Sequence, residues 1–88
     1  LSLIDRLNDK ERLATQASVL DVQGGLQMEQ GRMREAIATW ETAEAIYRQI
    51  GAPEKAMRNQ VNQAQALQRL GFYRRAIDLL TPITDSLA

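Results

Sequence analysis

The sequence offers few residues that could perform acid–base or metal chemistry. Two pairs of carboxylates stand at helical spacing, Glu41 with Glu44 and Asp5 with Asp9, and such pairs can act as general acid and base. The chain contains no histidine and no cysteine, so it lacks the usual general base, the thiolate nucleophile and the common zinc ligands. Both carboxylate pairs lie among arginines on the side of each predicted helix opposite its apolar stripe, which is typical of a solvated surface. The sequence therefore predicts no catalytic residue, no metal site and no cofactor.

Nucleotide, nucleic-acid and membrane binding are not predicted either. The glycines Gly24, Gly25 and Gly31 are not followed by the Lys-Ser/Thr of a phosphate-binding loop. The 11 basic residues balance the 11 acidic ones, so the chain lacks the broad cationic field of a nucleic-acid binder. No stretch approaches the roughly 20 apolar residues of a membrane span. We expect a soluble, cytoplasmic chain, and its start at Leu1 rather than methionine suggests a fragment of a longer protein.

Composition and apolar spacing predict an all-α fold. Only five glycines and two prolines interrupt the chain, and the abundant alanine and glutamine favour helix. Apolar residues recur at intervals of three and four, which predicts helices over about residues 9–30, 33–50, 53–70 and 73–87. Residues 1–8 would be the tail of a preceding helix or an N-terminal extension.

Single residues predict where these helices start and stop. Asn8 followed three residues later by Glu11 is typical of a capping box at the start of the first helix, and Pro53 suits the first position of the third. Pro82 removes one backbone donor inside the last helix, where we expect a kink or short break with the chain staying helical. A glycine suited to a left-handed stop follows each of the first three helices: Gly31, Gly51 and Gly71.

The chain repeats itself at an interval of 40 residues. A shift of 40 places Gly31 on Gly71 and Ile37 on Ile77, which indicates two helical hairpins. Small residues in the helices would let the helix axes approach closely: Gly24, Ala64, Ala36 and Ala76. The aromatic residues are predicted to fill the core and the helix contacts: Trp40, Tyr47, Phe72 and Tyr73.

Two segments, residues 31–37 and 64–77, resemble tetratricopeptide repeats, whose first helix ends at a glycine followed five residues later by alanine. Trp40 and Ala43 also fall where that pattern has a large residue and then an alanine. The resemblance covers roughly residues 10–88. It implies a right-handed superhelical solenoid with one repeat over residues 9–51 and a second over 52–88. Residues 40–41, 45–51 and 62–68 are also similar to the repeats that precede a caspase-like CHAT domain in cyanobacterial proteins.

Three glutamines depart from the tetratricopeptide pattern. Gln23 and Gln63 replace a leucine, and Gln27 replaces an aromatic residue. Gln23 and Gln63 can hydrogen-bond across helices, or their stems can pack while their amides reach water. We favour the second interpretation.

The resemblance implies that the first helix of each repeat lines a concave groove that binds a partner peptide or protein. The polar face of the third helix can donate and accept hydrogen bonds to an extended peptide and grip a carboxylate. The candidate groove residues come from the third and first helices: Arg58, Asn62, Gln65, Gln68, Arg69, Asp21, Gly25, Met28 and Glu29.

Residues 54–75 form a basic segment in an otherwise neutral chain. Glu54 is its one acidic residue. Its basic residues are Lys55, Arg58, Arg69, Arg74 and Arg75. The segment either attracts an acidic partner or pairs with the carboxylates of the neighbouring hairpin: Glu29, Glu35, Glu41 and Glu44.

The sequence predicts a protein–protein interaction scaffold with no enzymatic activity. The alternative is a regulatory or oligomerising arm of a larger enzyme, such as a caspase-like CHAT protease, with its catalytic domain outside this chain. A two-repeat array also leaves an unpaired flank on the last helix, which would permit a homodimer. That flank is predicted around Ile77, Leu80, Ile83 and Leu87.

Overall fold

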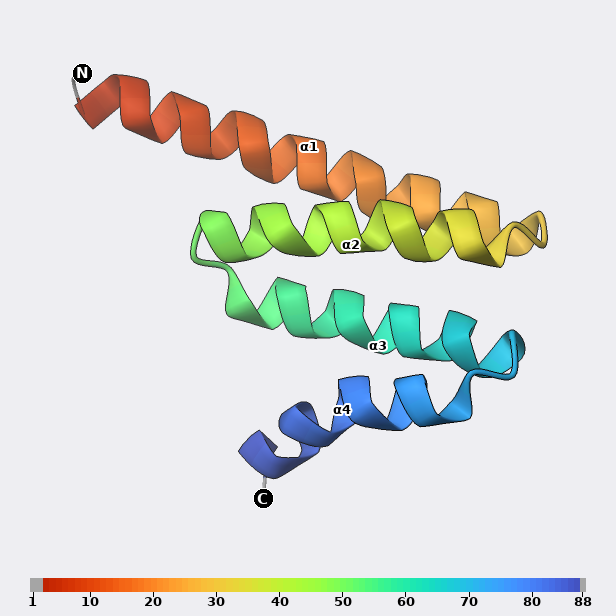
Figure 1. Cartoon of the computed structure of the whole chain (residues 1–88). Coiled ribbons are helices and arrows are strands. Elements are labelled where there is room, and N and C mark those ends of the chain that lie inside the picture. The colour runs from red at the N-terminus through yellow and green to blue at the C-terminus, as the bar shows by residue number, and fades with distance from the viewer. Residues whose placement is uncertain (1–2, 88) are drawn as a thin grey trace.

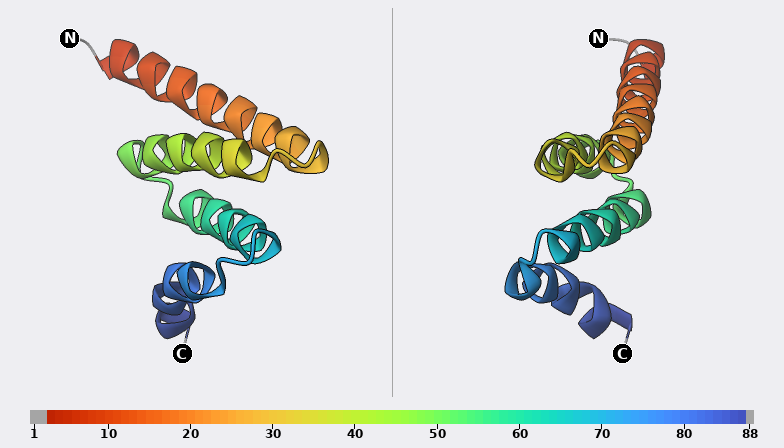
Figure 2. Two further views of the ribbon diagram at one scale, coloured as in Figure 1. Left: turned by 45° about the vertical axis from the view of Figure 1, so that its right-hand side comes forward. Right: turned by 90° about the vertical axis from the view of Figure 1, so that its right-hand side faces the viewer.

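Four α-helices, stacked in chain order, form the described part of the molecule (Figure 1). The computed structural model describes residues 3–87, except the side chains of residues 84, 86 and 87. The helices are α1 (Leu3–Glu29), α2 (Met33–Gln49), α3 (Pro53–Arg69) and α4 (Tyr73–Leu87). Each runs antiparallel to the one before and packs against it, and the two further views in Figure 2 show successive helices turned relative to one another. The all-α prediction is confirmed as an array of helical hairpins.

The predicted glycine stops are confirmed at all three positions. Gly31, Gly51 and Gly71 have φ angles of 80°, 73° and 85°, the left-handed region that glycine enters without a Cβ clash. After α1, the amide of Arg32 donates to the carbonyl of Gln27 at 2.8 Å, and Gly31 donates to Met28 at 3.0 Å. This is the Schellman pattern that satisfies the last carbonyls of a helix, and it recurs after α2 and α3.

The predicted start of the first helix is wrong. Asn8 and Glu11 form no capping box, because α1 runs without interruption from Leu3 through both residues. Residues 3–8 contain no glycine or proline, and a single Asn in a helix interior costs only about 0.7 kcal/mol. That local penalty is too small to begin a new helix. Residues 3–8 are therefore the first turns of α1 rather than a separate tail.

Pro82 lies inside α4, and the chain stays helical around it as predicted. The ribbon of α4 bends in its C-terminal part (Figure 1). The Thr81 hydroxyl donates back to the carbonyl of Ile77 at 2.7 Å. Such a back-bond, together with the donor that proline lacks, is a known cause of helix bending.

The apolar core consists of two clusters along the stack. One joins α2, α3 and α4 around Trp40 and Leu67, and the other joins α1, α2 and α3 around Tyr47 and Ala56. Trp40 and Tyr47 are 3% and 2% exposed, which confirms them as core residues, whereas Tyr73 is 65% exposed and was wrongly assigned to the packing. Among residues 3–87, no helix is long and apolar enough to cross a membrane.

Close helix approach depends on the predicted small residues. Gly24 of α1 lies directly against the Trp40 ring of α2, where an added Cβ would fall 2.4 Å from Nε1. The other predicted small residues are also buried: Ala36, Ala64 and Ala76. The first pair of helices therefore meets through a large ring seated on a glycine.

Candidate functional site

Asp21 of α1 anchors a polar network that holds the first three helices together. Its Oδ2 accepts a hydrogen bond from the Tyr47 hydroxyl of α2 at 2.5 Å, and its Oδ1 accepts from Asn59 Nδ2 of α3 at 2.5 Å. The indole Nε1 of Trp40 donates to the Asp21 backbone carbonyl at 3.1 Å. Asn59 is 1% exposed, so its amide depends on these protein partners for its hydrogen bonds.

Glu44 of α2 anchors the second half of the same network. Gln63 Nε2 of α3 donates to Glu44 Oε1 at 2.9 Å and to Asn59 Oδ1 at 2.7 Å. Gln60 Nε2 and Arg48 Nε both donate to Glu44 Oε2, at 3.0 and 2.9 Å. Among the described residues, every buried side-chain nitrogen and oxygen has a partner, so the network is satisfied and not merely buried.

This network corrects two predictions from the sequence. Glu44 was assigned to a solvated surface, but its side chain is only 18% exposed because α3 packs over it. The favoured interpretation of Gln63, an amide reaching water, is also wrong, since Gln63 is 4% exposed and bonds across helices. Gln23 is exposed as that interpretation predicted, because no described helix lies on its side of α1. Gln27 accepts a hydrogen bond from Thr39 of α2 at 2.7 Å.

The network changes the acidity of Tyr47. Burial raises the pKa of the Tyr47 phenol above its ordinary value of 10.0, and the hydrogen bond to Asp21 raises it further. A hydrogen bond from Ser18 and the nearby charge of Arg58 act in the opposite direction on this pKa. The hydroxyl is therefore held as a neutral donor to Asp21.

A cavity of about 240 Å³ opens beside Asp21, between α1, α2 and α3. It is lined by Ser18, Asp21, Tyr47, Lys55 and Arg58. Lys55 Nζ lies 6.0 Å from the centre of the Tyr47 ring. Among the described side chains, neither Lys55 nor Arg58 has a carboxylate within ion-pair distance. The cavity therefore presents two unpaired cations beside a carboxylate whose oxygens already accept hydrogen bonds from Tyr47 and Asn59.

The candidate groove residues lie on α1 and α3, and we call this set of residues the α1–α3 face. Asp21 and Arg58 line the same cavity and are the two candidates that the structure brings together there. Met28 packs against the core instead of standing free. The exposed candidates are Arg58, Gln65, Gln68, Arg69 and Glu29; the partly buried ones are Asp21, Gly25, Met28 and Asn62. Ser18 and Lys55 complete the cavity; Ser18 was not predicted, and Lys55 was assigned only to the basic segment.

Among the described side chains, no ion pair joins the basic segment to a carboxylate of the first hairpin. The ion pairs among the described side chains all join residues three or four apart: Arg12 with Asp9, Arg32 with Glu35, Arg48 with Glu44, and Arg74 with Asp78. Arg75 lies over the ring of Phe72, 5.6 Å from its centre, and Arg34 lies 5.3 Å from the same ring. Of the two alternatives for residues 54–75, the ion pairs with Glu29, Glu35, Glu41 and Glu44 are therefore not found in the described part of the chain.

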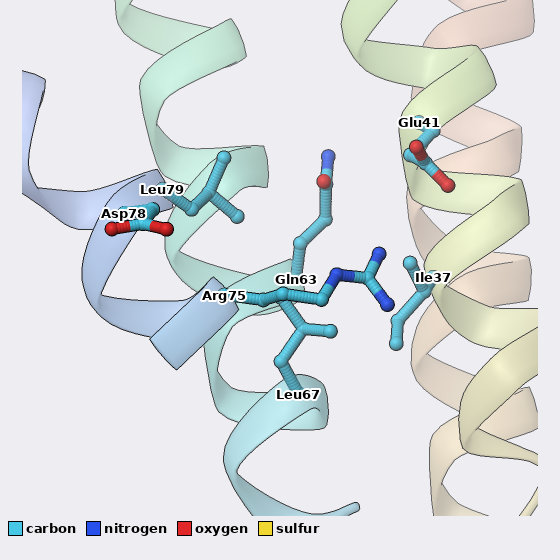
Figure 3. A pocket seen from close by; sticks show the side chains of 7 residues that line it. All are labelled: Ile37, Glu41, Gln63, Leu67, Arg75, Asp78 and Leu79. Atoms are coloured by element: carbon cyan, nitrogen blue, oxygen red, sulfur yellow. The ribbon is translucent and has the colours of Figure 1, made fainter. Parts of the chain in front are cut away.

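A second cavity, of about 360 Å³, lies between α2 and α4 over α3 (Figure 3). The Arg75 side chain reaches across it from α4 toward Ile37 of α2, and Glu41 and Asp78 stand on opposite sides (Figure 3). Its lining residues are Ile37, Glu41, Gln63, Leu67, Arg75, Asp78 and Leu79. Within the described part of the chain, no group of three or more carboxylates is placed to hold a metal ion.

No family model, curated protein or solved structure matches this chain.

The network itself was not predicted from the sequence, although one signal was present. Asn59 and Gln63 stand within the stripe that begins at Ala56 and ends at Leu67, so two polar residues occupy core-facing positions of α3. Polar residues on such a stripe require partners on a facing helix. Tyr47 and Asp21 could not be identified as those partners from spacing, because Asp21 lies 38 residues before Asn59.

Proposed function

We propose that this chain is a segment of a tetratricopeptide-type scaffold that binds an acidic segment of a partner protein along the α1–α3 face. In this proposal the two hairpins wind in a right-handed superhelical sense, and the concave side is the α1–α3 face. The chain performs no reaction itself. Its function is to hold a partner in a defined position.

The repeat architecture supports the tetratricopeptide assignment. Two antiparallel hairpins follow one another at the 40-residue interval of the sequence repeat, and the same glycine stop ends α1 and α3. The small residues of the repeat, Gly24 and Ala64, are both buried at helix contacts. Stacked hairpins of this kind expose extended surfaces that bind other proteins.

The pair Lys55 and Arg58 carries the proposal for an acidic partner. Both cations border the 240 Å³ cavity, and neither has a carboxylate partner among the described side chains. Arg69 is exposed farther along the same helix. An incoming Asp or Glu side chain can form charge-assisted hydrogen bonds with either cation, and these are among the stronger contacts a protein surface makes.

The Asp21 network prepares this face for binding. Tyr47 and Asn59 hold α2 and α3 against α1 through hydrogen bonds of 2.5 Å to Asp21, so the separation of the walls is set before a partner arrives. Binding to such a face needs little rearrangement, and the free energy lost in ordering the site is small.

The test is a titration of a fluorescein-labelled ten-residue peptide of alternating Glu and Ser, followed by fluorescence anisotropy. We expect the double variant Lys55→Ala with Arg58→Ala to raise the Kd at least about tenfold, because each lost charge-assisted hydrogen bond is worth about 1 kcal/mol or more. Affinity of the wild type should also fall with added salt. A peptide with Gln in place of Glu should bind weakly to all variants.

Arg12→Ala with Arg74→Ala is the matched control. It removes the same charge from exposed positions that pair within their own helices, and it should leave the Kd unchanged. Equal losses in the two double variants would show that net charge alone attracts the peptide. Equal affinity of the wild type and the Lys55/Arg58 variant would rule out the proposed site.

A further inference from the structure

The outer side of α1 carries an apolar stripe that no described residue covers. Three large apolar residues on this side are between 54% and 66% exposed: Val19, Val22 and Leu26. The opposite side of α1 contains Ala17 and Gly24, which are buried against α2. Figure 1 shows α1 at one end of the array and α4 at the other. Exposed apolar stripes of this extent typically mark contact surfaces.

The 40-residue repeat identifies which side of α1 is uncovered. The shift places Val19 on Asn59 and Leu26 on Ala66 of α3. Asn59 and Ala66 are 1% and 0% exposed, whereas Val19 and Leu26 are 61% and 54% exposed. Asn59 belongs to the junction that α3 forms with α1 and α2, where it accepts from Gln63 beside Glu44. We define the α1 edge as Val19, Gln23 and Leu26. Through the repeat it corresponds to the side of α3 that packs against the preceding hairpin.

The other end of the array shows the complementary half of the same junction. The shift places Ile77 of α4 on Ile37 of α2. Ile37 is 8% exposed and borders a cavity together with Gln63 and Leu67 of α3, whereas Ile77 is 59% exposed. The predicted unpaired flank of α4 is confirmed at Ile77; Leu80 and Ile83 are partly buried, and the Leu87 side chain lies outside the described residues. We define the α4 edge as the side of α4 centred on Ile77. Through the repeat it corresponds to the side of α2 that packs against α3.

We propose that the α4 edge of one copy packs on the α1 edge of a second copy, repeating between molecules the junction that α2 and α3 form within one. Each copy carries both halves of a junction that the molecule already builds once, which is why a second copy is the partner that fits. At the α1 edge, Val19 and Leu26 replace the interior Asn59 and Ala66, so the contact between copies buries more apolar side chain than the interior junction does. The contact is heterologous, and it extends into open chains because each added copy exposes a new edge.

The first measurement is the molar mass of the 88-residue chain by light scattering over a range of concentrations. The wild type should rise from the 9.9 kDa monomer through multiples of that mass without stopping at two copies. Val19→Lys with Leu26→Lys closes the α1 edge, and Ile77→Lys closes the α4 edge. Each variant alone should remain at 9.9 kDa. Val61→Lys, on an exposed apolar residue of α3 outside both edges, should behave as the wild type.

The decisive measurement mixes the two edge variants in equal amounts. The Ile77→Lys chain keeps an intact α1 edge, and the Val19/Leu26 variant keeps an intact α4 edge, so one junction remains possible. The mixture should form a complex of two copies and no larger species. Circular dichroism should show unchanged helix content in both variants, because the substituted side chains are exposed.

Three outcomes would overturn the proposal. One is a wild type that stays at 9.9 kDa at millimolar concentration, and another is a mixture that stays monomeric. The third is an Ile77→Lys variant that still forms dimers, since this would show an α1-to-α1 contact between identical edges. Loss of peptide binding in the Lys55/Arg58 variant should not change any of these masses, because those residues lie outside both edges.

Discussion

At the scale of single residues, Asp21 of α1 accepts hydrogen bonds from both α2 and α3. Its carboxylate accepts one hydrogen bond from α2 and one from α3, and its backbone carbonyl accepts a third from Trp40. Removing a partner from such a buried network leaves the remaining donors unsatisfied, which costs more than the bond itself contributes. One side chain on α1 therefore links three helices beside the proposed binding cavity.

The raised pKa of Tyr47 predicts a loss of stability at alkaline pH. The folded state disfavours the phenolate, because burial and Asp21 raise the pKa above 10.0. The unfolded chain therefore loses this proton at lower pH than the folded chain. The stabilisation is fully present below about pH 10 and is lost as the pH rises toward the folded value. We expect the free energy of unfolding, from urea titrations between about pH 9 and 11, to fall more steeply in the wild type than in Tyr47→Phe.

Tyr73→Phe is the matched control for this pH dependence. Tyr73 is 65% exposed, so removing its hydroxyl tests whether the loss of any tyrosine hydroxyl changes the alkaline slope. If Tyr47→Phe declined as steeply as the wild type, the Tyr47 hydroxyl would not be the titrating group.

At the scale of elements, α1 and α2 meet where the Trp40 ring covers Gly24. A Cβ at Gly24 would lie 2.4 to 2.7 Å from three atoms of that ring, whereas a Cβ at Gly25 would have no atom within 4 Å. Both glycines lie inside α1. Two neighbouring residues of one type therefore have different structural roles, and only the packing of α2 distinguishes them.

Alanine substitution at these two glycines should change stability in opposite directions. Gly24→Ala should lower the free energy of unfolding by about 1 to 3 kcal/mol, because the ring has to move out of a filled contact. Gly25→Ala should raise it by about 0.5 to 1 kcal/mol, since alanine restricts the unfolded chain and favours helix. Urea unfolding with an unchanged slope measures both. A stabilising Gly24→Ala would mean that Trp40 does not occupy its place against α1.

At the scale of the whole molecule, the array is one-dimensional: each helix packs mainly on the next one in the chain. The Cα positions extend over 48 × 34 × 13 Å, so the stack is broad and thin. In such an array stability depends on neighbour contacts, and the outer parts open first. Residues 3–12 of α1 are all exposed and extend beyond the end of α2 (Figure 1).

Hydrogen exchange of the monomer should follow this arrangement. We expect the amides of residues 3–12 to exchange about 100-fold or more faster than those in the middle of α2 and α3, because local opening there exposes no packed surface. Mass spectrometry of peptic fragments at low protein concentration measures the difference. Equal protection along α1 would show that its first turns are packed against something in solution.

Most of the fold was predictable because its signals are local. Gly31, Gly51 and Gly71 mark helix ends through a backbone angle that other residues rarely adopt, and Pro53 begins α3 as expected. The start of α1 was not predictable from Asn8, since a capping residue is also tolerated inside a helix at small cost. Of the residues that line the cavity beside Asp21, the sequence analysis had named Asp21 and Arg58 as groove candidates and Lys55 only as part of the basic segment, while Ser18 and the burial of Glu44 were not predicted.

The sequence by itself determined four helices, their glycine stops, the 40-residue repeat and the small residues at helix contacts. These depend on neighbours within one or two turns of the chain or on self-similarity along it. Only the tertiary structure decided which polar residues meet. Asp21 and Asn59 are 38 residues apart and Glu44 and Gln63 are 19 apart, and their contact depends on how each helix is rotated about its axis against the next. Helical periodicity shows which residues share a face, but it contains no information about the residues that the neighbouring helix places opposite them.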